Sequence, residues 1–163
     1  MNKIAIIFDE TNDWLFYYFK KYNFKKNNDH IDYFYDAYLV KKYDVVFILG
    51  YTKILSKEFL YQNKLNLVVH ESNLPHGKGF SPLQNQLINN KNEIVISLLE
   101  ANEIVDSGDI ILQTKIYFDG TELYKKIRRK QADATIDIIE KFLKSYPNFI
   151  RRQQVGKSSY YQK

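Results

Sequence analysis

Residues 69–83 read Val-His-Glu-Ser-Asn-Leu-Pro-His-Gly-Lys-Gly-Phe-Ser-Pro-Leu. The mostly apolar run at 65–69 predicts a buried strand that delivers His70. The proline and glycines that follow predict a loop. Ser81-Pro82 then predicts the start of a helix, with serine as the cap and proline in the first turn. This strand–loop–helix unit places an imidazole at the edge of a sheet, beside exposed backbone.

The rest of the chain alternates between strand and helix patterns. Runs of β-branched and aromatic residues predict further strands at 3–8, 31–38, 44–49, 93–100 and 110–118. Capping residues predict helices that begin at Thr11–Asn12 and at Ser56, and 121–146 predicts a long amphipathic helix that Pro147 ends. A polar stretch at 23–30 separates the first helix from the second strand.

This alternation predicts the α/β class, with a mainly parallel sheet flanked by helices. Ligands of such sheets bind beyond the carboxyl ends of the strands. Gly50 and His70 both fall at such ends.

The composition excludes several classes of protein. The 163 residues suffice for one domain with a single core. There is no cysteine, which excludes disulfides and thiolate chemistry, and neither a membrane span nor a signal peptide is recognisable. We therefore expect a cytoplasmic protein without a membrane partner. The three histidines lack the spacing of metal ligands, so we expect no metal.

A second motif, Glu-Ile-Val-Asp-Ser-Gly-Asp-Ile-Ile-Leu-Gln, occupies residues 103–113. Its Asp106 lies 36 positions after His70. By itself Asp106 would be read as a turn former, and a lone histidine at a strand end as a structural residue. Paired across a cleft, the carboxylate could orient the imidazole and keep it poised as a base at neutral pH.

The two motifs, in this order and at this separation, resemble those of the folate-dependent formyltransferases. That family carries a His-x-Ser-x-Leu-Pro loop and, at about this interval, an Asp-x-Gly-x-Ile loop. The resemblance is closest to the small sugar N-formyltransferases of the pseudaminic-acid branch. It implies a Rossmann-like formyltransferase fold, a catalytic domain at 1–150 with a basic, aromatic tail at 151–163, and His70 and Asp106 as the catalytic residues.

The resemblance also implies a cosubstrate, 10-formyltetrahydrofolate, and two sets of binding residues. The folate would lie against residues in and next to the loops after the strands predicted at 44–49 and 93–100, namely Tyr51, Thr52, Ile54, Leu99, Ala101, Asn102, Val105 and Asp106. The acceptor would lie against residues of the glycine-rich loop and the tail, namely Ser72, Asn73, Gly77, Lys78, Gly79, Arg151 and Tyr160. An ordinary strand-to-helix connection or a plain turn is the alternative reading of these loops.

One position departs from the family pattern. The family places an asparagine two residues before the histidine, where it helps to stabilise the oxyanion; here that residue is Val68. Protonated His70 or a backbone amide of the Gly77–Gly79 loop could take over this role. The alternative is a folate- or nucleotide-sugar-binding module that has lost catalysis.

The acceptor follows by elimination within the family. The first strand lacks the glycine-rich phosphate loop of the ribonucleotide enzymes, and the chain is too short for the additional domain of methionyl-tRNA formyltransferase. We therefore expect a nucleotide-linked 4-amino-4,6-dideoxy sugar, carried on UDP or dTDP, with formylation of a different amine as an alternative. Small members of the family are often homodimers, and we expect one here.

Two basic segments invite other readings. The net charge of +5 and the cluster at 125–130 suggest RNA, but on a helix these residues spread around the cylinder, and we expect no nucleic-acid partner. Gly156-Lys157-Ser158 resembles the end of a phosphate-binding loop but lacks the earlier glycine. We expect the tail to be a disordered extension or to continue into further chain.

Overall fold

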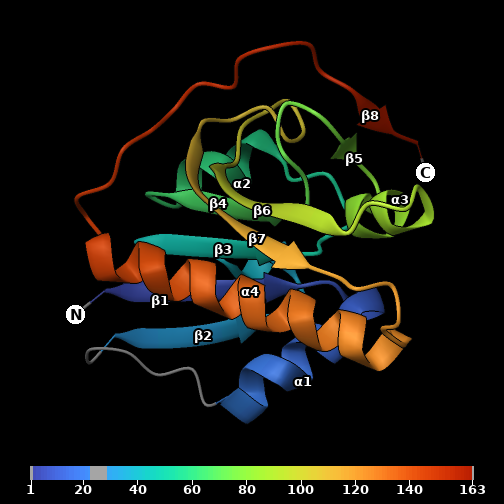
Figure 1. Cartoon of the computed structure of the whole chain (residues 1–163). Helices are drawn as coiled ribbons and strands as arrows, with labels where there is room; N and C mark the ends of the chain where they lie inside the picture. Colours follow the sequence, from blue (N-terminus) through green and yellow to red (C-terminus); the bar gives the residue numbers. More distant parts are fainter. Residues whose placement is uncertain (1, 23–28, 163) are drawn as a thin grey trace.

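The computed structural model describes residues 2–22 and 29–162, which form one mixed sheet with helices on both faces (Figure 1). The sheet contains β1 (Lys3–Phe8), β2 (His30–Phe34), β3 (Val45–Leu49), β4 (Asn66–His70), β6 (Glu93–Glu100) and β7 (Ile110–Tyr117). The helices are α1 (Asp13–Tyr22), α2 (Lys57–Gln62), α3 (Pro82–Ile88) and α4 (Tyr124–Ser145). Two short strands, β5 (Lys78–Gly79) and β8 (Tyr160–Tyr161), form a separate pair.

The strand order β2-β1-β3-β4-β6-β7 confirms the mainly parallel α/β architecture. Strands β2, β1, β3 and β4 are parallel, whereas β6 is antiparallel to β4 and β7 to β6. The carboxyl ends of β1, β3 and β4 therefore lie along one edge of the sheet, which is where open α/β sheets bind ligands.

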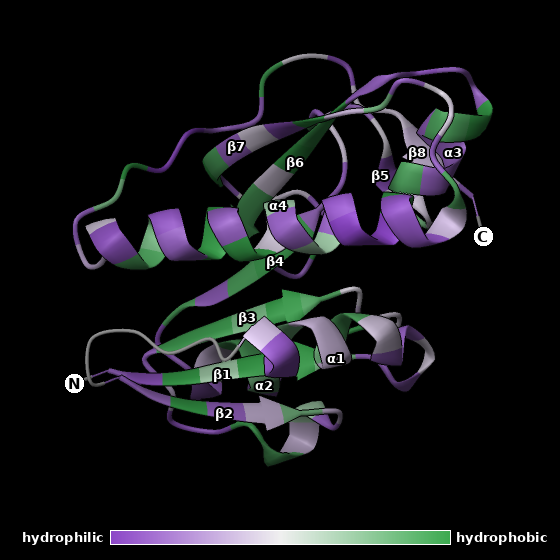
Figure 2. Cartoon of the chain, turned by 60° about the horizontal axis from the view of Figure 1, so that its bottom comes forward, coloured by the Kyte–Doolittle hydropathy of each residue, from purple (hydrophilic) through white to green (hydrophobic). Residues whose placement is uncertain are grey.

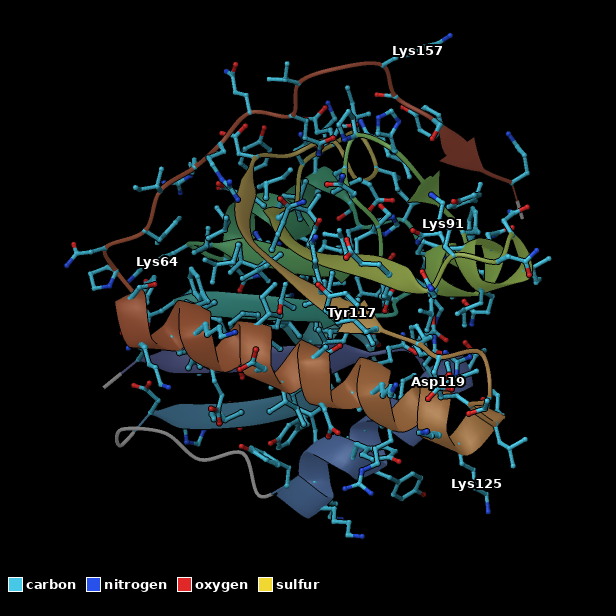
Figure 3. The ribbon with its side chains drawn as sticks, viewed as in Figure 1. Lys64, Lys91, Tyr117, Asp119, Lys125 and Lys157 are labelled. Atoms are coloured by element: carbon cyan, nitrogen blue, oxygen red, sulfur yellow. The ribbon has the colours of Figure 1, made fainter. Side chains whose placement is uncertain are left out.

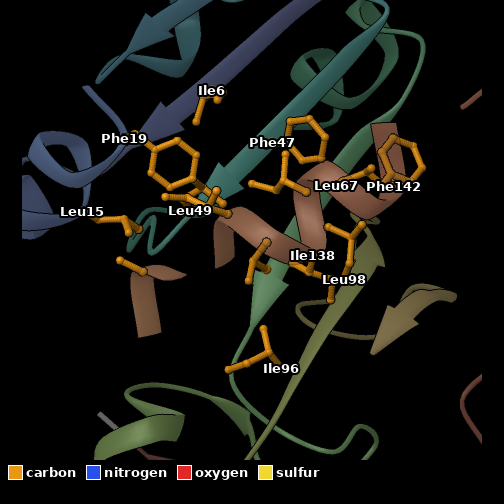
Figure 4. Close-up of a cluster of buried hydrophobic side chains, with 14 of the residues drawn as sticks. Ile6, Leu15, Phe19, Phe47, Leu49, Leu67, Ile96, Leu98, Ile138 and Phe142 are labelled. Atoms are coloured by element: carbon orange, nitrogen blue, oxygen red, sulfur yellow. The ribbon is translucent and has the colours of Figure 1, made fainter. Parts of the chain in front are cut away.

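Alternate residues of the central strands build two cores. Ile4, Ile6 and Phe8 of β1 face α1 and α4, whereas Ala5 and Ile7 face α2. Figure 4 shows the larger core, in which Phe47 of β3 lies beside Phe142 of α4 with ring centroids 5.8 Å apart. Figure 2 shows the same pattern as hydropathy: β3 is hydrophobic along most of its length, and α4 is hydrophilic on part of its circumference. Burial on both faces explains the nearly continuous apolar runs.

Local chemistry moves several boundaries from their expected places. β2 ends at Phe34 instead of continuing to 38, because the Asp36 carboxylate accepts from the Tyr38 amide and starts the short 3-10 turn Ala37–Leu39. The first helix begins after another such turn, Glu10–Asn12, which Asp9 caps. Ser81 precedes α3 as expected, but in the left-handed region and without a side-chain capping bond. Most of the polar stretch at 23–30 lies outside the described residues.

The tail differs from the expected disordered extension. Figure 1 shows it leaving the end of α4 and arching over the sheet to β8, beside β5. Along this path Arg152 forms a two-hydrogen-bond bridge with Ile110, and Tyr160–Tyr161 pairs in parallel with Lys78–Gly79. The tail thus contacts both of the segments that the sequence motifs single out.

The basic side chains are distributed over the surface. In Figure 3, Lys64, Lys91, Lys125 and Lys157 lie at widely separated points of the molecule. Within the cluster at 125–130, Lys126, Arg129 and Lys130 each have a carboxylate within 4 Å. The described residues contain no helix with the length and apolar character needed to cross a bilayer.

Candidate functional site

His70 ends β4 and lies in a buried position between two loops. Its side chain is 7% exposed. Nε2 lies 2.8 Å from the carbonyl oxygen of Gly77, and Nδ1 lies 3.5 Å from Oδ2 of Asp106. The structure therefore brings together the two residues that the motifs identify.

Asp106 is held in a tight turn between β6 and β7. Its backbone is in the left-handed region, with φ of 52°, which is uncommon for a residue other than glycine. Its Oδ2 also accepts a hydrogen bond from the backbone N–H of Gly79 at 2.9 Å. The turn requires Gly108, because a Cβ there would lie 1.8 Å from the carbonyl oxygen of Glu100.

The hydrogen bonds of His70 define what this pair can do. Because Gly77 presents only a carbonyl oxygen, Nε2 must carry a proton and donate it. In the neutral imidazole Nδ1 then carries no proton, and its lone pair lies beside the carboxylate of Asp106. A proton taken up at Nδ1 gives an imidazolium that Asp106 stabilises. The arrangement can therefore remove a proton from a nucleophile and return it.

The glycine-rich loop packs under the tail instead of lying open. Gly77 and Lys78 are buried, and the Lys78 ammonium donates to the Ser107 hydroxyl at 2.8 Å. Ser72 is 1% exposed, and its Oγ is buried without a hydrogen-bond partner among the described residues. Of the residues expected at the acceptor in this loop, Asn73 is exposed and Gly79 is half-buried. Their roles stay predictions.

The two tail residues expected at the acceptor lie in different places. Tyr160 is exposed in β8, and its ring centroid is 5.8 Å from the Lys78 ammonium. Arg151 instead forms an ion pair with Glu100 at 2.6 Å. Glu100 is opposite Leu67 in the sheet, whereas His70 is opposite Ser97. Arg151 is therefore held three register positions away from the His70–Asp106 pair.

One wall of the expected folate pocket is the loop after β3. Thr52 donates both its backbone N–H and its hydroxyl to Oδ2 of Asp9, at 2.9 and 2.6 Å. Oδ1 of Asp9 accepts the matching pair of bonds from Thr11. Burial would raise the pKa of Asp9, but these four hydrogen bonds outweigh it and hold the pKa far below its usual range. Asp9 therefore ties the end of β1 to this loop.

Asp9 was not among the residues that the sequence motifs indicate. Its place at the carboxyl end of a predicted parallel strand was the available signal. The side chain of Asn12 adds a second tie, because its Nδ2 donates to the carbonyl oxygen of Gly50 at 2.7 Å.

The other wall is the loop after β6. Lys57 of α2 forms an ion pair with Glu103 at 2.6 Å, which joins the two loops. Ile54 on one side is 86% exposed, and Ile104 and Val105 on the other are 67% and 53% exposed. Such exposed apolar side chains fit the face of a flat heterocycle. Tyr51 and Ala101 are half-buried beside it, and Asn102 uses its Oδ1 to accept from the Ile104 amide.

Leu99 has a supporting position below these loops. It is 1% exposed and packs with Leu74, Ile110 and Val68. Its side chain does not itself reach the surface.

The Asp9 hydrogen bonds predict a pH-dependent effect on stability. We expect Asp9→Asn to lower the free energy of unfolding by about 2 kcal/mol at pH 7, since hydrogen bonds to a buried carboxylate are lost. A depressed carboxyl pKa stabilises the fold fully above the unfolded-state value of about 3.9, and this stabilisation is lost as pH falls towards the folded-state pKa. The difference from wild type should therefore shrink below about pH 4.

Urea unfolding of both proteins at pH 7 and at pH 3 measures this difference. Asp36→Asn is the matched control, because Asp36 is exposed and accepts one backbone hydrogen bond, from Tyr38. A deficit of Asp9→Asn that stays constant or grows on acidification would contradict the role assigned to the Asp9 carboxylate.

Comparison with known proteins assigns the chain to a family. The family model described as formyl transferase matches residues 9–142, which include both His70 and Asp106. The chain belongs to this family. Methionyl-tRNA formyltransferase from Caldicellulosiruptor saccharolyticus is 30% identical over 119 residues, covering 72% of this chain and 38% of that protein. The chain thus spans little more than a third of the length of such relatives.

Two solved structures share the fold. Methionyl-tRNA formyltransferase from Clostridium thermocellum has a TM-score of 0.78 at 22% identity, covering 99% of this chain and 72% of that one. The formyltransferase PseJ from Anoxybacillus kamchatkensis has a TM-score of 0.68 at 17% identity, covering 98% of this chain and 85% of that one. The PseJ structure is a complex with UDP-4,6-dideoxy-4-formamido-L-AltNAc and tetrahydrofolate. These similarities confirm the formyltransferase fold.

Proposed function

We propose that this member of the formyl transferase family moves the formyl group of 10-formyltetrahydrofolate to the amine of a nucleotide-linked 4-amino-4,6-dideoxy sugar. The observation that carries the proposal is the buried His70–Asp106 pair, 3.5 Å apart at the carboxyl end of β4 and beside an apolar wall. The PseJ complex supports the folate and the sugar class, because that protein was solved with tetrahydrofolate and a UDP-linked formamido sugar.

The bound folate supplies an activated formyl carbon. As the acceptor amine bonds to this carbon, its nitrogen loses a proton, which Nδ1 of His70 accepts. Asp106 stabilises the resulting imidazolium, and the Gly77 carbonyl keeps the proton on Nε2. When the bond between the formyl carbon and the folate nitrogen breaks, His70 returns the proton to that nitrogen. The products are a formamide and tetrahydrofolate.

Val68 replaces the asparagine of the family, and its surroundings are apolar. It packs against the buried cluster that includes Ile48 and Phe59 and against the cluster of Leu74, Leu99 and Ile110. No side-chain amide at this position can therefore stabilise the negative charge that develops on the formyl oxygen. We propose that the imidazolium of His70 supplies the stabilisation.

Val68→Asn tests this assignment. An asparagine there would place a polar amide among apolar side chains, at a cost of about 1–3 kcal/mol. We expect a lower free energy of unfolding, measured in urea, and a slower formyl transfer. Val68→Ile is the control for side-chain size. An increase in turnover for Val68→Asn would show instead that the wild-type site lacks a donor that asparagine restores.

A second acceptor, the amine of methionyl-tRNA, is favoured by the methionyl-tRNA formyltransferases among the sequence relatives. A direct comparison decides between the two. The protein is supplied with 10-formyltetrahydrofolate and either UDP- and dTDP-linked 4-amino sugars or methionyl-tRNA, and products are followed by mass spectrometry. The proposal predicts a gain in mass equal to that of CO on a nucleotide sugar. If only methionyl-tRNA is formylated, the acceptor is the amine carried by the tRNA and not that of a nucleotide sugar.

The remaining alternative is a binding module without turnover. A titration with 5-formyltetrahydrofolate, followed by the fluorescence of Trp14, separates it from the enzyme. Binding without product from any acceptor would support the module, whereas absence of binding would remove the folate from the proposal.

A further inference from the structure

The tail residues 152–161 contact both sides of the His70–Asp106 pair. The bridge between Arg152 and Ile110, with N–O distances of 2.8 and 3.0 Å, aligns the tail with the start of β7. This alignment brings Gln154 to the turn that carries Asp106, two residues further along the tail. Figure 1 shows how the tail continues from here to β8.

Gln154 binds the Asp106 turn through a single amide group. Its Nε2 donates to the carbonyl oxygen of Asp106 at 2.8 Å and to that of Gly108 at 2.8 Å. Both protons of the amide are therefore used on the two carbonyls that bracket Ser107. Its Oε1 is buried and has no hydrogen-bond partner among the described residues. The amide is therefore oriented for these two carbonyl oxygens, although its own oxygen is left without a hydrogen bond. This orientation makes the contact specific.

The turn needs external contacts. Asp106 adopts φ of 52°, and such a conformation in a residue other than glycine persists only where the surroundings impose it. Three hydrogen-bond donors from other segments hold residues 106–108 of the turn: the Gln154 amide, the Gly79 amide at the carboxylate and the Lys78 ammonium at Ser107. Of these, only the Gln154 amide comes from outside the glycine-rich loop.

The tail also holds Gly77, whose carbonyl oxygen is the partner of Nε2, the other ring nitrogen of His70. The Gly77 N–H donates to the Ser159 hydroxyl at 2.9 Å, and the Lys78 N–H donates to the Ser159 carbonyl at 2.9 Å. A Cβ on Gly77 would lie 2.8 Å from the Tyr161 ring, so only glycine fits beneath the tail here. The Gly77 carbonyl that faces His70 Nε2 is thus held from the tail as well.

We propose that Gln154 is a positioning residue of this site, which fixes the Asp106 turn so that the carboxylate faces Nδ1 of His70. The effect of Gln154 on the rate of formyl transfer rests on the proposed function. Its effect on the geometry of the His70–Asp106 contact does not depend on that function. If Gln154 only attached the tail, its removal would change stability without changing the environment of the His70 ring.

The first test uses the 15N chemical shifts of the His70 ring, assigned by comparison with His70→Gln. We expect Gln154→Ala to move these shifts in the direction that Asp106→Asn moves them. Gln153→Ala, a change at the exposed neighbouring residue, should leave them in place. Unchanged His70 shifts in folded Gln154→Ala would overturn the proposal. If Gln154→Ala fails to fold, Gln154→Met, which keeps the length of the side chain, takes its place under the same criterion.

The second test is a double-mutant cycle on the rate of formyl transfer. We expect Gln154→Ala to lower kcat about 10-fold, because the Asp106 carboxylate that stabilises the His70 imidazolium is misplaced, with little change in KM for the folate. In the Asp106→Asn background the same change should have no further effect, since a residue that acts through Asp106 cannot act without it. Independent, multiplicative effects would overturn the proposal. Absence of activity in the wild type would instead refute the proposed function, and the test on the His70 ring would still decide the role of Gln154.

Discussion

His70→Gln and Asp106→Asn are each expected to lower the rate of formyl transfer by about 10²- to 10⁴-fold, while the chain keeps its fold. The glutamine amide can still donate to the Gly77 carbonyl that Nε2 of His70 now faces at 2.8 Å, but it cannot accept a proton. The asparagine can still accept from the Gly79 amide, but it carries no charge to stabilise an imidazolium. Each variant thus removes the chemistry and preserves a structural contact.

The measurement is the initial rate at saturating folate and acceptor, with circular dichroism to confirm the fold. His76→Gln is the matched control, since His76 lies in the same loop and is exposed. It should retain wild-type activity. A rate for His70→Gln close to that of His76→Gln would remove His70 from the mechanism.

Gly108→Ala is expected to have the second large effect, this time on both stability and activity. A Cβ at this position would lie 1.8 Å from the Glu100 carbonyl oxygen and 2.8 Å from its carbonyl carbon, both of which are backbone atoms. The Glu100 N–H also donates a hydrogen bond to the Asp109 carbonyl oxygen. The two segments therefore cannot move apart without losing this hydrogen bond. We expect the free energy of unfolding to fall by at least about 3 kcal/mol.

Urea unfolding measures the loss of stability in Gly108→Ala, and the formyl-transfer rate measures displacement of Asp106. Gly120→Ala is the control, because a Cβ there meets nothing within 4 Å, although its φ of 88° carries some strain. Comparable losses of stability in the two variants would show that the contact with Glu100 is not what makes glycine necessary at 108.

The sequence was sufficient to predict the fold class because the central strands are buried on both faces. Val45–Leu49 is apolar at every position, and such a short run predicts a strand that is buried on both faces. Boundaries were less predictable where a polar side chain redirected the backbone. Asp36 ends β2 by capping the turn that follows, and this interaction competes with strand pairing. Hydrophobic periodicity does not predict such a local hydrogen bond.

The meeting of His70 and Asp106 was predictable from their motifs, because each motif fixes a loop at the same edge of the sheet. The residues that hold this pair and the loop after β3 were not. Asp9, Gln154 and Ser159 act through hydrogen bonds to segments that are 43, 48 and 82 positions away. No local spacing encodes such contacts. The ion pair between Arg151 and Glu100 was likewise not encoded by local spacing, and the expected role of Arg151 at the acceptor stays a prediction.

The environment of Lys78 was also hidden from the sequence. A lysine between two glycines in a loop would ordinarily be placed in solvent, yet this one is 5% exposed. Its burial follows from the tail, which pairs with its backbone and covers its side chain with Tyr160. Lys78 supports the Asp106 turn through Ser107, and its expected role at the acceptor stays a prediction.

The most direct test of the account follows a 13C-labelled formyl group from 10-formyltetrahydrofolate to the acceptor amine. Tetrahydrofolate and formylated nucleotide sugar are quantified in the same reaction by mass spectrometry. We expect the wild type to form tetrahydrofolate and formylated nucleotide sugar in equal amounts. We expect His70→Gln to form neither product at a comparable rate. Release of labelled formate without a labelled amine, or transfer that proceeds unchanged in His70→Gln, would contradict the account.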